Sequence, residues 1–311
     1  MHHCRPWQLQ VWLYQQRWHC PWATQLTHRR GLYLALQTPF GKQCWGEVAP
    51  LPKFSQESLR DCWRALLSHL NQQRVAPPAA LAWGALCANR TYPQAIAPLS
   101  APYPLLQGSE ETILSHLRLW PQPLTRAKLK VARGATSDEL ALIKTIHAHY
   151  PTLRLRLDAN GGWTRRQART FIAQLPMDAI EYIEQPCQTL ADCVYIAQQN
   201  RCPIALDESL QREPVTHCDL RHISALVIKP MLLGHNTEHY CQLAQRLGLT
   251  VSISSSFESP LGLAHLRELA TTYHDTAPGL DTLSYFSGSL QQRLIHQSYW
   301  PDNPLLNFEQ V

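Results

Sequence analysis

A repeat in the C-terminal two-thirds of the chain restricts the fold most strongly. Short apolar runs alternate there with amphipathic stretches at a near-constant spacing. The runs with strand character are 127–131, 153–158, 179–184, 204–207, 226–229 and 250–255. Stretches such as 137–149 and 164–175 have helical periodicity, with Ser137 and Thr164 as expected N-caps. This alternation predicts a parallel sheet built from βα units.

The residues that end these runs are charged or polar. An open, doubly wound sheet usually presents one ligand loop at its switch point, whereas here each successive strand ends in a polar side chain. A (β/α) barrel instead gathers all of its strand ends on one face. We therefore expect a barrel in which six side chains share one face: Lys130, Asp158, Glu184, Asp207, Lys229 and Ser254.

Three carboxylates stand in the middle of that series. Asp158, Glu184 and Asp207 end consecutive strands, so their side chains should converge, and they would repel one another without a cation between them. Mg²⁺ suits such a set because it takes oxygen ligands and keeps positions open for water or substrate. The alternative for each acid alone is a helix cap or a surface ion pair with arginine.

Lysines stand on either side of the carboxylates. Lys128 and Lys130 point to the same side of their strand, so both should face the barrel interior. A neighbouring ammonium and a metal ion would lower the pKa of Lys130 to about 7 to 8, which suits a general base. Lys229 should approach from the opposite wall.

Two further residues have two readings each. Arg156 shares the inward face with Asp158, where it could form a structural salt bridge to the metal carboxylates or contact a substrate carboxylate. Ser254 ends the last run, where a serine either binds substrate or caps the next helix.

The N-terminal third has a different character. Runs at 32–36 and 44–48 flank a turn and predict a hairpin. An amphipathic helix should follow, with Ser55 as its N-cap and apolar residues from Leu59 to Leu70 on one face. Hairpin and helix together indicate a small α+β unit. Five prolines between residues 77 and 102 place the domain boundary near residue 100.

Composition excludes several classes of protein. With 45% hydrophobic and 16% charged residues, the 311-residue chain should fold. The net charge of +5 comes from dispersed basic residues and not from a stripe suited to nucleic acid. No apolar run reaches the roughly 18 residues that cross a membrane, and the start lacks the pattern of a secretory signal. Ten cysteines without a CxxC pair suit a reducing compartment, so we expect a cytoplasmic protein.

Five strand-end motifs occur in order, followed by two later loops. They resemble the enolase superfamily and, within it, the o-succinylbenzoate synthases of menaquinone biosynthesis. A stretch in the N-terminal third, 45–52 with 54–55, resembles the loop with which the family's capping domain closes over substrate. The motifs are Lys128-Leu129-Lys130, 155–160, Glu184-Gln185-Pro186-Cys187, 206–209, 227–230, 254–259 and 279–283.

The resemblance implies a fold, a reaction and a set of site residues. The fold would be an α+β capping domain, residues 1–100 with the tail 290–311 packing back on it, plus a modified (β/α)₇β barrel over 101–290. The enzyme would be a Mg²⁺-dependent lyase, with Mn²⁺ as a substitute, that dehydrates 2-succinyl-6-hydroxy-2,4-cyclohexadiene-1-carboxylate to 2-succinylbenzoate. Enolase-superfamily sites are a known case of a lysine or histidine base acting beside Mg²⁺. The implied metal ligands are Asp158, Glu184 and Asp207, the catalytic residues Lys130 and Lys229, and the substrate contacts Lys128, Arg156 and Ser254.

Other reactions of enolase-superfamily enzymes remain alternatives to this dehydration. Dipeptide epimerisation, N-acylamino acid racemisation and muconate cycloisomerisation all begin with proton abstraction beside a carboxylate. A dipeptide epimerase needs a pair of acids to hold an amine, and 279–283 supplies only Asp281. A barrel without catalysis is less consistent with five retained charges. The expected partner is a small carboxylate molecule, and the sequence leaves the oligomeric state open.

Overall fold

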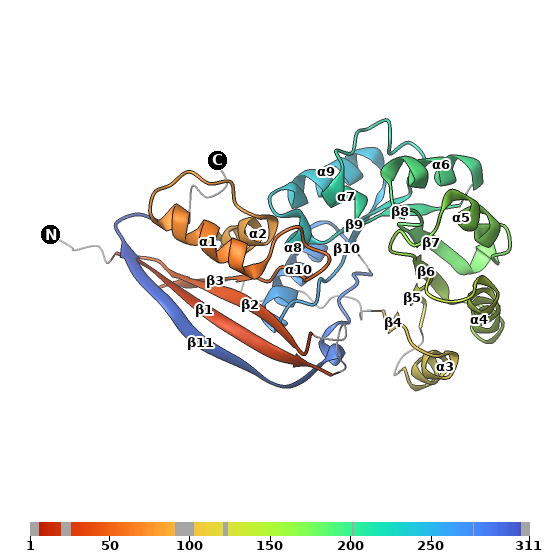
Figure 1. Ribbon diagram of the computed structural model, residues 1–311, viewed down its shortest axis with the longest axis horizontal. Helices are drawn as coiled ribbons and strands as arrows, with labels where there is room; N and C mark the ends of the chain where they lie inside the picture. Colours follow the sequence, from red (N-terminus) through yellow and green to blue (C-terminus); the bar gives the residue numbers. More distant parts are fainter. Residues whose placement is uncertain are drawn as a thin grey trace.

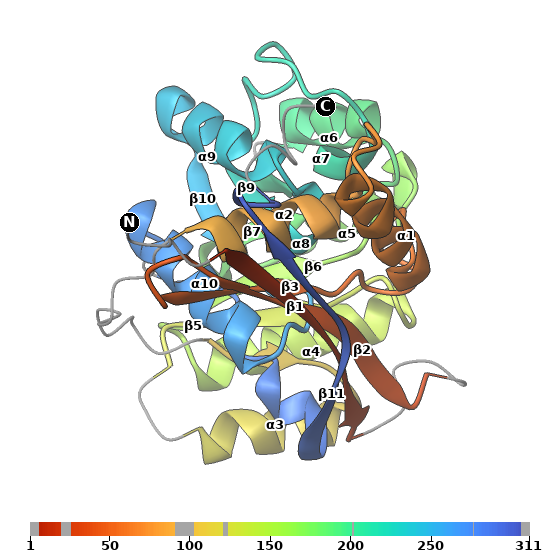
Figure 2. The same cartoon turned by 90° about the vertical axis from the view of Figure 1, so that its left-hand side faces the viewer.

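A computed structural model describes residues 6–19, 26–90, 103–120, 124–200, 202–275 and 277–305. Two β-sheets with helices packed around them make up this part of the chain (Figure 1). A parallel sheet of seven strands runs in chain order from β4 to β10, and an antiparallel sheet of four strands has the order β11-β1-β2-β3. We call the antiparallel sheet the capping sheet. In Figure 2 it lies in front of the parallel strands.

The capping sheet contains the predicted hairpin together with two strands that local patterns did not reveal. β2 (His28–Gln37) and β3 (Gln43–Val48) pair antiparallel across the expected turn, which confirms the hairpin. β1 (Trp7–Trp18) precedes them. β11 (Phe286–Trp300) returns from the C-terminal side and pairs with β1 from Trp7↔Trp300 to Trp18↔Phe286. The boundary predicted near residue 100 lies outside the described residues.

Two helices belong with the capping sheet. α1 (Leu59–Leu70) forms where its apolar spacing predicted it, but the predicted cap is wrong. Ser58 caps the helix in a capping box with Asp61, while the hydroxyl of Ser55 accepts a hydrogen bond from the backbone N–H of Leu51. Ser55 therefore closes the preceding turn.

α2 (Ala79–Asn89) was not predicted as a helix. It is apolar on all sides and therefore has no amphipathic period, because it is buried between β3 and the short helix α8 (Pro230–Leu233). A Cβ on Gly46 of β3 would lie only 1.9 Å from the carbonyl oxygen of Gly84, so glycine is required for this close approach.

The parallel sheet confirms the six predicted strands and adds a short one. Its register sets Lys130 beside Asp158, and Asp158 beside Glu184. Strand β4, with two residues, is too short to give a sequence pattern. The strands are β4 (Leu105–Leu106), β5 (Arg126–Lys130), β6 (Arg154–Asp158), β7 (Ile180–Glu184), β8 (Ile204–Leu206), β9 (Ala225–Ile228) and β10 (Thr250–Ile253).

Helices connect these strands. Thr164 caps α5 in a capping box with Gln167, as predicted. The predicted cap of α4 is wrong, since that helix begins at Thr136 and the hydroxyl of Ser137 donates to Asp138. The remaining bounds are α3 (Glu110–Leu119), α4 (Thr136–His149), α5 (Arg165–Ile172), α6 (Leu190–Asn200), α7 (Ser209–Arg212), α9 (Asn236–Leu247) and α10 (Pro260–Thr272), with 3₁₀ turns at Met177–Ala179 and Leu283–Tyr285.

The parallel sheet curls into a barrel. Arg156 of β6 donates to the hydroxyl of Ser252 in β10 at 3.2 Å, although three strands separate them in the sheet order. Between β10 and β4 the chain near Gly279 fills the wall. Gly279 forms a parallel bridge with Ser254, and the hydroxyl of Tyr285 donates to the carbonyl oxygen of Leu105. The predicted architecture of a parallel barrel with an α+β unit is confirmed.

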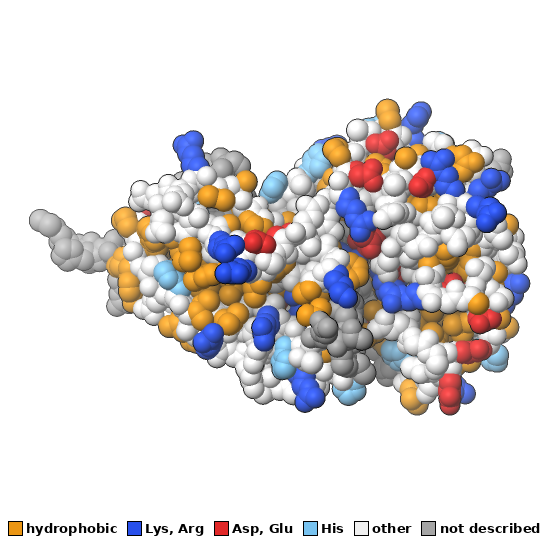
Figure 3. Space-filling view, viewed as in Figure 1, with side chains coloured by type: hydrophobic (Ala, Val, Ile, Leu, Met, Phe, Trp, Pro, Cys, Tyr) orange, Lys and Arg blue, Asp and Glu red, His pale blue; other side chains and the backbone are white. Residues whose placement is uncertain are grey.

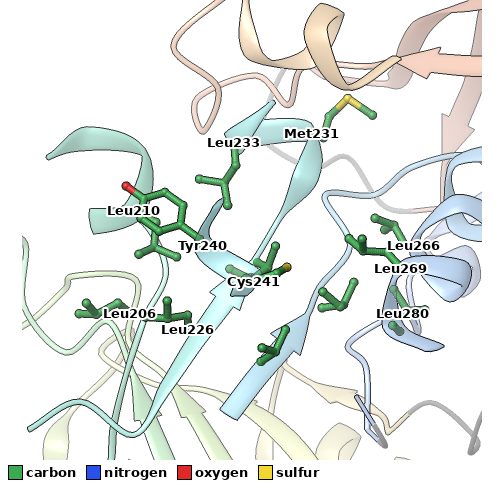
Figure 4. Close-up of a cluster of buried hydrophobic side chains, with 14 of the residues drawn as sticks. Leu206, Leu210, Leu226, Met231, Leu233, Tyr240, Cys241, Leu266, Leu269 and Leu280 are labelled. Carbon is green, nitrogen blue, oxygen red and sulfur yellow. The ribbon is translucent and has the colours of Figure 1, made fainter. Parts of the chain in front are cut away.

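Apolar side chains fill the space between the barrel strands and the outer helices. Figure 4 shows part of this core where β8 and β9 meet helices α7 to α10, with Leu206, Leu226, Tyr240, Cys241 and Leu266 among the buried residues. Cys241 serves there as a small apolar side chain. Among the described helices, none has both the length and the apolar character needed to cross a bilayer.

Candidate active site

Three carboxylates lie together at the C-terminal ends of neighbouring barrel strands. Asp158 is the last residue of β6, Glu184 is the last residue of β7, and Asp207 directly follows β8. All three side chains are buried. Buried ionised carboxylates need cations or hydrogen-bond donors beside them, and here lysines supply both.

Lys128 and Lys130 of β5 approach from one side. The Nζ atom of Lys128 lies 2.7 Å from Asp158 Oδ2 and 2.7 Å from Glu184 Oε1, so it bridges two of the acids. The Nζ atom of Lys130 lies 2.6 Å from Asp158 Oδ2 and donates to Asn160 Oδ1 at 2.8 Å. Alternation along the strand brings both lysines to the interior, as expected.

Lys229 approaches from the other side, directly after β9. Its ammonium group donates to Asp207 and lies 3.9 Å from Glu184 Oε1. The structure thus places Lys130 and Lys229 on opposite sides of the carboxylate group. The five charged strand-end residues predicted to converge form one connected network, in which Lys128 joins Asp158 to Glu184.

The network separates the pKa values of its acids. Burial raises the pKa of Glu184 to about 8, and the neighbouring Asp158 and Asp207 contribute to the increase. Burial acts in the same direction on Asp158, but the ammonium groups of Lys128 and Lys130 hold the pKa of Asp158 well below its ordinary value. The raised pKa of Glu184 therefore reflects its burial and its two carboxylate neighbours, although lysines also surround the group.

The two flanking lysines differ in the same way. Burial lowers the pKa of Lys130 below its ordinary value, with Lys128 and Lys229 adding to the effect and Asp158 opposing it. Burial alone would also lower the pKa of Lys229, but nearby carboxylates, Asp207 foremost, raise it above the ordinary value. Lys130 is therefore the better proton acceptor, and Lys229 the more persistent cation.

A cavity of about 280 Å³ lies over this network. Its floor includes the three lysines and Asn160, and its roof is the loop that follows β3. Sequence reasoning did not assign Tyr103, Gln107 or Arg133 to the site, because nothing in their local pattern marks them. The lining residues are Leu51, Lys53, Phe54, Tyr103, Leu105, Gln107, Lys128, Lys130, Arg133, Asn160, Lys229, Leu232, Ser254, Ser255, Ser256, Phe257, Gly279 and Asp281.

Comparison with known proteins was made on sequence and on structure. Residues 116–304 match the family model described as "Enolase C-terminal domain-like", and residues 21–90 match "MenC, N-terminal domain". An o-succinylbenzoate synthase of Enterobacter sp. (strain 638) is 36% identical over 297 residues, which cover 90% of this chain and 89% of that protein. One of Yersinia enterocolitica is 35% identical with the same coverage. The chain belongs to the o-succinylbenzoate synthase family of the enolase superfamily.

Solved structures agree with this membership. The crystal structure of o-succinylbenzoate synthase from Thermosynechococcus elongatus BP-1, complexed with Mg in its active site, matches with a TM-score of 0.70 at 25% identity, covering 91% of this chain and 95% of that one. The L-Ala-D/L-Glu epimerase of Bacillus subtilis matches with a TM-score of 0.75 at 18% identity, covering 90% of each chain. The likeness to the epimerase shows a common fold, whereas the sequence identity to o-succinylbenzoate synthases identifies the family.

In this family member Arg156 lies deeper than the cavity. Its guanidinium pairs with Glu181 at 2.9 Å, donates to the carbonyl oxygen of Ala277 at 2.9 Å, and lies over the rings of Tyr103 and Tyr182. The ion pair predicted between Arg156 and the metal carboxylates is wrong for the described residues, because Glu181 is the partner instead. The predicted contact of Arg156 with a substrate carboxylate stays a prediction. Ser254 lines the cavity, as does Lys128.

Two residues beside the carboxylates organise the site of this o-succinylbenzoate synthase family member. Asn160, in the left-handed region at φ 47°, accepts from Lys130 and donates to Glu208 Oε1 at 2.9 Å. Gln185, buried at φ 39°, accepts from the backbone N–H groups of Asp207 and Ser209. Both follow a carboxylate at the end of a strand, and that position is the sequence signal that could have identified them.

A buried arginine joins the capping sheet to the barrel. Arg29 of β2, 2% exposed, donates to the carbonyl oxygens of Ala49 and Pro50, and to those of Ser256 and Phe257. One guanidinium therefore connects the two loops that wall the cavity.

Glu47 of β3 makes a second connection. Its carboxylate accepts from the hydroxyl of Tyr14, from the N–H and hydroxyl of Ser259, and from the N–H of Gly262. Since Ser259 and Gly262 lie at the start of α10, Glu47 fixes the capping sheet against this barrel helix.

Proposed function

We propose that this protein is an o-succinylbenzoate synthase of menaquinone biosynthesis. As a lyase it would convert 2-succinyl-6-hydroxy-2,4-cyclohexadiene-1-carboxylate to 2-succinylbenzoate and water. The observation that carries the proposal is the placement of Lys130 and Lys229 on opposite sides of three buried carboxylates, in a chain 34–36% identical to curated o-succinylbenzoate synthases over about 90% of its length.

The donor set suits a divalent cation. Asp158, Glu184 and Asp207 offer oxygen ligands, which Mg²⁺ prefers and Mn²⁺ accepts. Among the described residues, no three acids, histidines or cysteines already surround a point that would hold an ion. The Nζ atom of Lys128 lies between Asp158 and Glu184 instead. A cation thus already occupies this position in the form of an ammonium group.

The raised pKa of Glu184 supports the same assignment, because burial and two neighbouring carboxylates disfavour its negative charge. A divalent ion would relieve that crowding, and Lys128 would then turn its ammonium group toward the substrate. When bound, the metal supplies positive charge that stabilises the developing negative charge on a substrate carboxylate. We propose Mg²⁺ as the resident ion.

Lys130 would perform the proton transfers. In its neutral form the Nζ atom takes the proton from the carbon that bears the ring carboxylate. The C–H electron pair becomes part of the ring double bonds as the C–O bond to the hydroxyl breaks. The same Nζ atom returns its proton to the departing hydroxyl, so the products are the aromatic ring and one water molecule. The lowered pKa of Lys130 favours the neutral form that this role needs.

Lys229 would remain charged throughout. Its raised pKa keeps the ammonium group protonated, and its position across the carboxylates places a positive charge beside the ring. Such a charge stabilises the negative charge that develops on the ring as the proton leaves, by electrostatic and cation–π attraction. We propose Ser254 as a substrate contact, since it lines the cavity, and Arg156 as a residue that supports the barrel wall.

The expected partner is therefore a small carboxylate. We further propose a cytoplasmic location, which suits the reduced thiols of Cys187 and Cys193. The Sγ atom of Cys193 donates there to the carbonyl oxygen of Cys187.

The test is a direct assay. Purified protein with Mg²⁺ should convert the cyclohexadiene substrate to 2-succinylbenzoate, followed by loss of the diene absorbance and by chromatography of the product. Lys130→Ala is the matched control and should lose the reaction. Absence of product, or a higher kcat/KM for epimerisation of any dipeptide, would contradict the proposal.

A further inference from the structure

Two of the cations that line the cavity form no ion pair with any described residue. Lys128, Lys130 and Lys229 each contact at least one of the site carboxylates. Lys53 and Arg133 also line the cavity, and within the part of the chain that the structure describes neither forms an ion pair with an acid. Among the described lining residues five are basic and one, Asp281, is acidic, so the cavity suits an anionic ligand.

Lys53 lies at the tip of a tight turn in the cavity roof. The N–H groups of Phe54 and Ser55 both donate to the carbonyl oxygen of Leu51, at 3.0 and 2.8 Å. Lys53 itself has φ 73°, a left-handed conformation that costs free energy in a residue other than glycine. Gln211 holds the turn against the barrel by donating to the carbonyl oxygen of Phe54 at 3.0 Å. A strained, anchored lysine at the cavity is typical of a ligand contact.

Arg133 is held in a comparable way on the opposite loop, directly after β5. The carboxylate of Glu139 accepts hydrogen bonds from the backbone N–H groups of Ala132, Arg133 and Gly134, at 3.0, 2.8 and 3.0 Å. These three hydrogen bonds fix the loop, in which Ala132 has the left-handed φ of 61°. The guanidinium is not paired with Glu139. Among the described residues its one side-chain hydrogen bond goes to Asn160 Oδ1, at 3.3 Å, so most of its donors have no partner there.

We propose that Lys53 and Arg133 together bind the second carboxylate of the substrate, at the end of its succinyl chain. The inference rests on the proposed function, in which the ring carboxylate goes to the metal and the lysines at the cavity floor. The succinyl carboxylate then needs a separate cationic partner, and these two side chains supply an ammonium and a guanidinium. They would select dicarboxylates over ligands with one carboxylate.

Paired ligands test this assignment. 2-Succinylbenzoate carries the second carboxylate, and 2-butanoylbenzoate replaces it by a methyl group. Lys53→Asn removes the charge and keeps a residue that tolerates left-handed φ, and Arg133→Gln removes the second charge.

Each variant should weaken binding of 2-succinylbenzoate about tenfold and change that of 2-butanoylbenzoate by less than about twofold. Calorimetry in the presence of Mg²⁺ measures both. In the dehydration assay KM should rise about tenfold while kcat stays within about threefold.

Lys144→Gln, which removes an exposed lysine on α4, is the matched control and should change neither affinity. An equal loss for both ligands would reveal a structural effect and overturn the assignment, as would no loss, or a selective loss in only one of the two variants. If the wild-type enzyme is active but the variants lose no more affinity for 2-succinylbenzoate than for 2-butanoylbenzoate, this assignment alone is refuted. Wild-type enzyme that neither turned over substrate nor bound 2-succinylbenzoate would refute the proposed function and this assignment with it.

Discussion

Glu258 should make the stability of this protein fall as the pH rises from about 4.5 to about 7. The side chain is buried in the loop between β10 and α10. Its Oε2 atom accepts from the hydroxyl of Ser255 and the N–H of Ser256, both at 2.6 Å. Its Oε1 atom has no hydrogen-bond partner within the described residues. Burial raises the pKa of Glu258 from 4.5 to about 7, with Glu47 adding to the effect.

The size and sign of the effect follow from these values. Between about pH 4.5 and pH 7 the folded protein holds a proton on Glu258 that the unfolded chain releases. Stability therefore falls as pH rises across that window and is constant again above it. A difference of about 2.5 pH units at about 1.4 kcal/mol per unit amounts to about 3 to 4 kcal/mol.

Glu258→Gln removes this titration while keeping the shape of the side chain. In urea denaturation followed by tryptophan fluorescence, the variant should match the wild type near pH 4.5 and exceed its free energy of unfolding by about 3 kcal/mol at pH 8. Every other titrating group is common to both proteins and cancels. Glu111→Gln, which replaces an exposed glutamate of α3, is the matched control for the substitution. A stability difference for Glu258→Gln that stayed constant from pH 5 to pH 8 would refute the reasoning.

Three further predictions concern the site. Lys130→Arg should lower kcat by about 10² to 10⁴ with an unchanged circular dichroism spectrum, because guanidinium does not deprotonate. Near-normal turnover by this variant would exclude Lys130 as the base. In the wild type kcat/KM should rise with pH as Lys130 loses its proton, at a pH below the 10.5 of an ordinary lysine. Glu184→Gln should weaken Mg²⁺ binding in calorimetry by about tenfold or more, since a metal prefers an ionised ligand, and an unchanged affinity would remove Glu184 from the ligand set. Arg29→Met should cost about 3 kcal/mol or more in urea denaturation, because it leaves buried carbonyl oxygens without donors, and a loss below about 1 kcal/mol would contradict the role of Arg29 between the two loops.

The sequence predicted the barrel and its charged centre because both depend on local order. Strand periodicity and the charge at each strand end are visible without knowledge of distant contacts, and alternation alone sends Lys128 and Lys130 to the same face. Once parallel strands follow one another in the sheet, Asp158 and Glu184 must lie side by side.

Other features depend on contacts that no local pattern records. α2 is apolar on all sides because the barrel and the capping sheet enclose it, so its helical period is hidden. The ion pair of Arg156 with Glu181 arises where β6 shifts register against β7, which strand alternation does not anticipate. Arg133 comes to the cavity through the loop held by Glu139, and Arg29 through the docking of one sheet on another.

The pairing of β1 with β11 has a consequence for how the protein is made. Strand β1 is synthesised long before β11, the strand that covers its outer edge, because the barrel lies between them in the sequence. Until β11 has been made, that edge has unpaired N–H and C=O groups that could pair with another strand. The barrel can therefore form before the capping sheet is complete, and closing so long a loop makes the final step slow. In a nascent chain stalled before residue 286 this edge would be free to bind chaperones or to pair with strands of other chains. Once β11 has been made, it pairs with β1 and covers the edge.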